Sequence, residues 1–211
     1  WGSADAYERN KIMHISRSDW EPGFGEIFTW FAMDKNGKIA VMVNNCWGRL
    51  PEALLVIPNF EDLLDDLNEY KWQESEKYAS YPAEKNGETI LDLYSSLIHG
   101  VNYPRQDVEF WMKSKQNSED LNEINMPSKK GFFIYHSLEG DNASKDYPVG
   151  YNGETKIGDY FRYLMPTVYA SINDFPTELH HGIAVSDTVD FNVDRLFDNE
   201  KISEYFPKMY R

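Results

Sequence analysis

Residues 27–44 read IFTWFAM (27–33), DKNG (34–37) and KIAVMVN (38–44), and this stretch decides the fold. The two flanking runs are rich in aromatic and β-branched residues, which favour strands. The segment between them contains Asn36-Gly37, and both residue types accept the positive φ that tight hairpins require. The pattern therefore predicts a β-hairpin, followed by a loop over residues 46–51.

Apolar residues recur at helical spacing in several segments that follow this hairpin. Asn59 is suited to an N-cap, and Glu61 and Asp62 complement the positive end of the helix dipole. Gly100 suits the position just past a helix end, and Pro104 suits a first helical position. We predict helices or helical turns over residues 51–56, 59–70, 88–99 and 104–115, and a solvated polar loop or a frayed helix over residues 114–125.

Strand-forming residues dominate again after Pro127. Strands are predicted over residues 132–135, 160–164 (halted by Pro166), 181–185 and 189–191, a polar turn over 139–146, a short helical turn at 176–178 and a terminal helix over 199–206. This order predicts an α+β fold, in which the N-terminal hairpin and the later strands share one antiparallel sheet that packs against several helices. The alternative is two small units divided near residue 127.

The length and composition of the chain indicate a folded protein. The chain has 211 residues, of which 41% are hydrophobic and 15% aromatic, and disordered chains are poor in such residues. Residues 1–12, which contain a Gly2-Ser3 pair typical of a cloning remnant, are expected to be a tag or an unstructured extension, and residues 13–211 a single domain. Cys46 is the only cysteine, and we find neither a signal peptide nor an apolar run that could span a bilayer. These features predict a soluble, cytoplasmic protein.

The charge balance points to a class of partner. Asp and Glu number 35 against 21 Lys and Arg, which gives a formal net charge of −14. A compact body with this charge repels nucleic acids and anionic membranes and attracts basic surfaces. We therefore expect neither a nucleic acid nor a membrane as partner.

Residues with reactive side chains form no known catalytic or metal-binding motif. Cys46 lies in a predicted loop, and His180 and His181 are adjacent, so in a strand their side chains would point to opposite faces. No HExxH, GxSxG or GxxxxGK motif accompanies them. We expect no catalytic residue, metal or cofactor; the alternative is a small hydrolase or transferase that uses Cys46 or the pair His180/His181.

The order of short motifs resembles that of one family type. MDKNGKI (33–39) leads into NCWGRLPE (45–52) and an acidic helix, and GFFIY (131–135) is followed by a polar turn and a strand that ends at Pro166. This arrangement resembles small acidic immunity proteins of bacterial contact-dependent growth inhibition and polymorphic toxin systems. The resemblance implies a non-enzymatic cytosolic antitoxin that binds one cognate toxin, in many cases a nuclease with a basic cleft.

Acidic side chains that cover such a cleft would exclude its substrate and would accelerate association. The candidate toxin-binding residues are those of the acidic helix and of the polar turn: Asp62, Asp65, Asp66, Glu69, Glu139, Asp141 and Asp146. An acidic adaptor or nucleic-acid mimic that acts on other proteins is a further hypothesis with the same charge logic.

Overall fold

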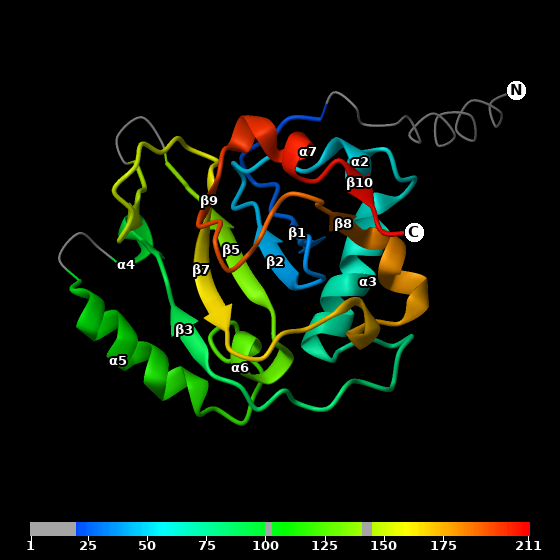
Figure 1. Cartoon of the computed structure of the whole chain (residues 1–211), viewed down its shortest axis with the longest axis horizontal. Coiled ribbons are helices and arrows are strands. Elements are labelled where there is room, and N and C mark those ends of the chain that lie inside the picture. Colours follow the sequence, from blue (N-terminus) through cyan, green and yellow to red (C-terminus); the bar gives the residue numbers. More distant parts are fainter. Residues whose placement is uncertain (1–19, 100–102, 141–144) are drawn as a thin grey trace, which may run out of the picture.

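The computed structural model describes residues 20–99, 103–140 and 145–211 (Figure 1). In chain order the elements are β1 (Thr29–Met33), β2 (Ile39–Val43), α2 (Glu52–Leu55), α3 (Phe60–Trp72), β3 (Thr89–Leu91), β4 (Tyr94–Ser95), α4 (Ser96–His99), α5 (Arg105–Gln116), α6 (Met126–Lys130), β5 (Phe133–Ser137), β6 (Pro148–Val149), β7 (Tyr160–Pro166), the 3-10 helices η1 (Ile172–Asp174) and η2 (Thr177–Gly182), β8 (Ile183–Val185), β9 (Leu196–Phe197), η3 (Asn199–Lys201), α7 (Ile202–Tyr205) and β10 (Lys208–Met209). The predicted α+β fold is confirmed. The expected extension over residues 1–12 lies outside the described residues.

The predicted hairpin is formed by β1 and β2, which pair antiparallel from Thr29–Val43 to Met33–Ile39. Gly37 supplies the positive φ, +80°, that the turn needs. The Asp34 carboxylate also shapes the turn, because its Oδ1 accepts hydrogen bonds of 2.9 Å from the backbone N–H groups of Asn36 and Lys38. The Asp34 carboxylate and the positive φ of Gly37 together fix the turn, and the turn fixes the register of β1 against β2.

One sheet of eight strands forms the centre of the molecule, in the order β10-β8-β1-β2-β5-β7-β3, with β9 paired to β7. The sheet is mixed, because β1 pairs parallel with β8 and β2 pairs parallel with β5. The prediction of an antiparallel sheet was wrong in this respect. A long connection that contains helices can return a strand in the same direction, whereas only neighbours in a hairpin must run antiparallel. Strands from before and after residue 127 lie side by side in this sheet, for example β2 next to β5 and β7 next to β3.

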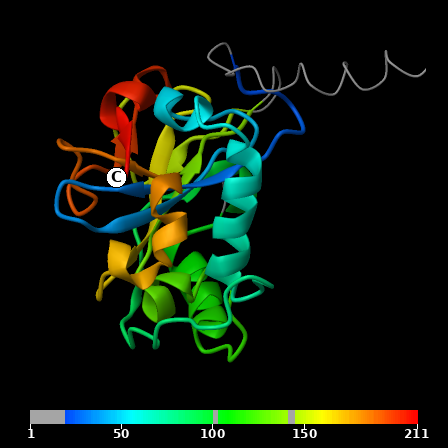
Figure 2. The same ribbon diagram turned by 90° about the vertical axis from the view of Figure 1, so that its right-hand side faces the viewer.

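Alternating side chains of the central strands pack on two different layers. Phe31 faces Phe132 and Phe175, at ring-centroid distances of 6.4 and 5.9 Å, on the side where α3 and η2 pack. Trp30 faces the other side and contacts Phe206 of the C-terminal segment at 5.4 Å. Figure 2 shows α3 alongside the hairpin strands, with the C-terminal helix on another side of the molecule. The sheet is therefore buried between a helical layer and an aromatic cluster formed late in the chain.

The predicted helix over residues 88–99 is wrong in its first two thirds. Residues 89–91 form β3, which pairs antiparallel with β7, residues 94–95 form β4, and only α4 is helical. Thr89 and Leu91 are buried while Ile90 between them is exposed, which is strand periodicity. Pairing with β7 overrides the local helical spacing, because short apolar runs fit either period.

Three further predictions need correction. The polar segment 114–125 contains the end of α5, at Gln116, but it is not simply solvated, because Asn125 is fully buried and donates hydrogen bonds to the Ser118 and Asp120 carbonyls. Residues 189–191 are not a strand but lead into a turn over residues 191–193, where the Phe191 N–H donates to the Asp34 carboxylate. The strand predicted over 181–185 begins only at Ile183, because the preceding residues complete η2.

Candidate functional site

Helix α3 carries the acidic residues that the sequence selects. Its apolar stripe faces the core, since Phe60, Leu63, Leu64 and Leu67 are buried, and this stripe forms the helix as an amphipathic element. Asp62, Asp65, Asp66 and Glu69 lie on the rest of the helix surface; Asp66 is half-buried and the other three are exposed. We call these four residues the acidic α3 face.

Little positive charge on α3 offsets this face. The only basic residue of the helix is Lys71, which is buried and donates from Nζ to Asn68 Oδ1 at 2.9 Å. Lys77, from the loop that follows, forms an ion pair of 2.7 Å with Asp66. Asp62, Asp65 and Glu69 have no ion pair within the described residues. The outward side of α3 is thus strongly negative.

Carboxylates of neighbouring segments extend the negative field. Burial raises the pKa of Tyr78, and the negative charges of Glu178 and Asp66 raise it further. A hydrogen bond from Lys77 to Asp66 raises the pKa of Lys77, and Glu69 adds to this effect. Glu178 of η2 therefore shares the electrostatic environment of the acidic α3 face.

Exposed apolar side chains occur in the two segments that adjoin the start of α3. The Phe28 ring lies 5.9 Å from the Phe60 ring, which places the segment before β1 beside the helix. Within that segment Phe24 is 93% exposed and Ile27 is 64% exposed, and Val56, just before α3, is 54% exposed. Apolar side chains beside a charged surface are typical of protein interfaces, where a few such side chains serve as anchors.

The predicted polar turn does not join this surface. The side chain of Asp146 is buried, and its two oxygens accept hydrogen bonds from Ser95 Oγ (2.8 Å), Ser96 Oγ (3.1 Å) and the Leu97 N–H (3.1 Å). This carboxylate caps α4, so it is not free to contact a partner. Helices α4 and α3 lie on opposite sides of the molecule (Figure 1).

Glu139 is half-buried, and burial together with the Asp146 charge raises its pKa. Asp141 lies outside the described residues. The structure thus keeps the acidic helix as a coherent surface and separates Asp146 from it. The sequence could not show this, because the hydroxyl groups that bind Asp146 come from a segment about fifty positions earlier.

The residues named for the enzymatic alternative do not form a catalytic arrangement with one another. Cys46 is half-buried in the loop after β2, and no hydrogen bond joins its thiol to a histidine within the described residues. His180 donates from Nε2 to the Phe175 carbonyl at 3.0 Å and contacts the Tyr210 ring, while His181 is exposed. A thiol needs a neighbouring base or a helix N-terminus to become a nucleophile.

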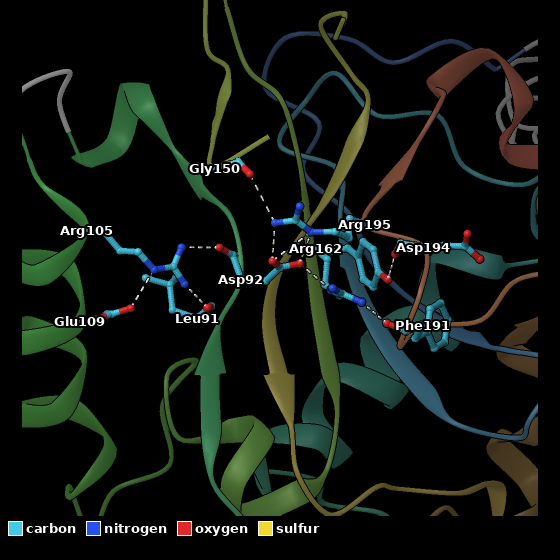
Figure 3. Close-up of polar contacts among 10 residues, drawn as sticks. Leu91, Asp92, Arg105, Glu109, Gly150, Arg162, Phe191, Asp194 and Arg195 are labelled. Carbon is cyan, nitrogen blue, oxygen red and sulfur yellow. Dashed lines mark hydrogen bonds and ion pairs between the residues drawn. The ribbon is translucent and has the colours of Figure 1, made fainter. Parts of the chain in front are cut away.

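The sequence did not predict a cluster of charged side chains in which Asp92 and Arg162 are largely buried and Arg195 is partly exposed (Figure 3). Asp92, just after β3, binds Arg162 of β7 through an Oδ2–Nε contact of 2.7 Å and Arg195 through an Oδ1–Nη2 contact of 2.6 Å. Arg162 also donates to the Phe191 carbonyl at 2.6 Å. Both carboxylate oxygens are occupied, so this cluster joins strands and does not offer a base.

The sequence also did not predict two further features: the titratable pair Glu123 and His136, and the buried Lys71. His136 Nε2 lies 2.5 Å from Glu123 Oε1. For Lys71 a signal existed, because it follows Leu67 by four positions and so continues the apolar stripe of α3. For the pair no signal existed, since the two residues belong to different elements.

Within residues 20–99, 103–140 and 145–211, no helix has the length and apolar character needed to cross a membrane. The same residues contain no group of three or more histidine, cysteine or carboxylate side chains placed to hold a metal ion. No protein-family model, curated protein or solved structure matches this chain.

Proposed function

We propose that this chain is a non-enzymatic inhibitory binding protein, an immunity protein that neutralises a basic toxin by covering its active-site cleft. The observation that supports this most is the acidic α3 face, whose helix turns its single cation, Lys71, inward. A nuclease cleft is basic because it binds phosphates, so a nuclease is the class of toxin that this surface would complement best.

Electrostatics would act at two stages of such an encounter. At long range, the net charge of −14 would steer a basic partner and raise the association rate, to about 10⁸ M⁻¹s⁻¹ or more at low salt. At contact, Asp62, Asp65 and Glu69 would occupy positions that substrate phosphates otherwise take. The salt dependence of association is therefore the first measurable signature.

Apolar contacts would supply specificity. Charge alone does not distinguish one basic protein from another, whereas a few desolvated anchors do. The exposed side chains of Phe24, Ile27 and Val56 belong to the segments that adjoin the start of α3 and fit this role. A standard interface buries about 1,600 Å² in total.

The test starts from the product of the gene adjacent to the one that encodes this chain. The two proteins are co-expressed and purified together, and the adjacent product is then expressed alone to ask whether it is toxic. For a captured complex, the association rate and Kd are measured between 50 and 500 mM salt. We expect the chain to relieve the toxicity and the association rate to fall steeply with salt.

Charge-matched variants then locate the surface. One variant carries Asp62→Asn, Asp65→Asn and Glu69→Gln on α3, and the control carries Asp107→Asn, Glu154→Gln and Glu204→Gln at exposed positions elsewhere. Both lose three negative charges, so a difference between them reports on position. We expect at least a tenfold weaker complex for the α3 variant only. Equal effects, affinity that does not change with salt, or saturable catalysis by the isolated chain would each contradict the proposal.

A further inference from the structure

A cavity of about 460 Å³ lies between α3, the central strands and the segment at the start of α6. Its apolar walls include Val41, Val43, Met126 and Ile134, and its polar groups include Lys71 and Glu123. Sites for small molecules have this size and this mixture of apolar walls with a few polar groups.

The Lys71 ammonium is the unusual feature of this cavity. The side chain is buried, and within the described residues its one hydrogen-bond acceptor is Asn68 Oδ1, at 2.9 Å. An ammonium group carries three donors, so two remain for another acceptor. Its other close neighbours are aromatic, since Nζ lies 4.8 Å from the Trp72 ring centroid and 5.8 Å from that of Phe31.

The nearest carboxylate does not neutralise Lys71. Glu123 influences the pKa of Lys71 but forms no ion pair with it, because its carboxylate binds His136 at 2.5 Å. Burial lowers the pKa of His136, yet the Glu123 charge and hydrogen bond outweigh burial and leave this pKa raised. Partial burial raises the pKa of Glu123, and His136 and Lys71 bring it below the usual value. Each member of the pair thus favours the charged form of the other.

Among the side chains that line the cavity, Lys71 carries the one positive charge, beside apolar walls, and the one carboxylate, Glu123, is engaged by His136. A buried charge without a counterion is unfavourable, so the site gains from a ligand that supplies one negative charge. A cation does not fit, because the Lys71 ammonium repels it and the one carboxylate of the lining, Glu123, already binds His136. A dianion such as phosphate fits poorly, because the lining offers a single ammonium and five apolar side chains.

We propose that this cavity binds a small organic monoanion with an apolar body, a carboxylic acid with an aliphatic or aromatic chain. Its carboxylate would contact the Lys71 ammonium, and its chain would pack against Val41, Val43 and Ile134. This site requires neither a protein partner nor the acidic α3 face, so it stands independently of the inhibitory function.

The test uses isothermal titration calorimetry of the full chain at pH 7 with 4-phenylbutyrate, and with 4-phenylbutyramide as the neutral probe of the same shape. The variant is Lys71→Met, and the control is Lys130→Met, which removes another buried lysine that does not line the cavity. We expect the amide to bind the native chain at least tenfold more weakly than the acid does. Lys71→Met should raise the Kd of the acid at least tenfold, whereas Lys130→Met should change it by no more than about twofold.

Methyl NMR of the chain with and without 4-phenylbutyrate shows which methyl groups the probe contacts. We expect shifts centred on Val41, Val43 and Ile134 in the native chain, and a variant with Val43→Phe should lose the acid and the amide alike because the cavity is filled. A thermal melt shows whether each variant is folded. The proposal is overturned if millimolar 4-phenylbutyrate gives no binding, if the amide binds equally, if folded Lys71→Met binds normally, or if the shifts lie elsewhere.

Discussion

The carboxylate of Asp92 accepts a hydrogen bond of 2.7 Å from Arg162 Nε, across a sequence separation of 70 residues. Both side chains are largely buried, at 11% and 6% exposure. Arg195 binds the same carboxylate, so one acidic group joins the end of β3 to β7 and to the segment before β9. This contact fixes the edge of the sheet in place.

Loss of that carboxylate is expected to destabilise the fold. Asp92→Ala leaves the Arg162 guanidinium buried without its counterion, and breaking such a pair costs about 3–5 kcal/mol. Urea unfolding at pH 7 measures the change. The control is Asp187→Ala, which removes the exposed ion pair with Lys208, 68% and 51% exposed, and should cost about 1 kcal/mol or less. Equal losses would mean that Asp92 is no more important than a surface charge.

Gly131 and Gly37 allow strain to be separated from steric clash. Both have φ of +80°, but a Cβ at Gly131 would lie 2.5 Å from the Ala170 backbone nitrogen, whereas a Cβ at Gly37 would meet nothing within 4 Å. Gly131→Ala should therefore cost about 2–4 kcal/mol, and Gly37→Ala only the strain, about 1–2 kcal/mol. Thermal unfolding of both variants tests this order, and a larger loss at Gly37 would refute it.

Lys71 should make stability rise with pH. Burial lowers its pKa from 10.5 to about 8, so between these values the unfolded chain binds a proton that the native chain lacks, and the free energy of unfolding increases with pH. Relative to Lys71→Met, the native chain should gain about 2 kcal/mol between pH 8 and pH 10. Urea unfolding at both pH values measures this difference.

Lys201→Met, at an exposed position of η3, is the control for that series and should show no such trend. Tyrosines with raised pKa values, such as Tyr70 at about 12, lower the stability at high pH in every variant. Their effect cancels in the difference from Lys71→Met. A difference that stays constant with pH would show that Lys71 keeps an ordinary pKa.

His136, which pairs with Glu123, should act in the opposite direction. The raised pKa of His136 stabilises the fold below pH 6.5, and this stabilisation is lost as the pH rises through the raised value. With Glu123→Gln, burial dominates and the pKa of His136 should fall below 6.5. NMR titration of the His136 ring measures it. Glu139→Gln, which removes a weaker charge near His136, should lower the pKa less.

Much of the local structure could be predicted from the sequence, because it depends on neighbours in the chain. The β1–β2 hairpin follows from strand formers around a turn with Gly37, α3 follows from the spacing of Phe60 and Leu67, and β7 ends near Pro166 as expected. The acidic α3 face is predictable for the same reason: residues opposite an apolar stripe must face solvent.

Contacts between distant segments decided what the sequence left open. The residues at 89–91 fit a helix or a strand, and β7 supplied the hydrogen bonds that select a strand. Asp146 and Asp62 carry the same charge, but Asp146 is buried and accepts hydrogen bonds from Ser95 and Ser96, whereas Asp62 is exposed to solvent.

The sequence by itself determined the hairpin, the amphipathic helix and the negative charge of this protein, since each arises from short-range periodicity or from composition. Only the tertiary structure decided the parallel strand pairs, the Asp92–Arg162 contact and the cavity around Lys71. Each of these joins residues that are far apart in the chain, and their side chains acquire a role only when burial replaces water with a specific neighbour.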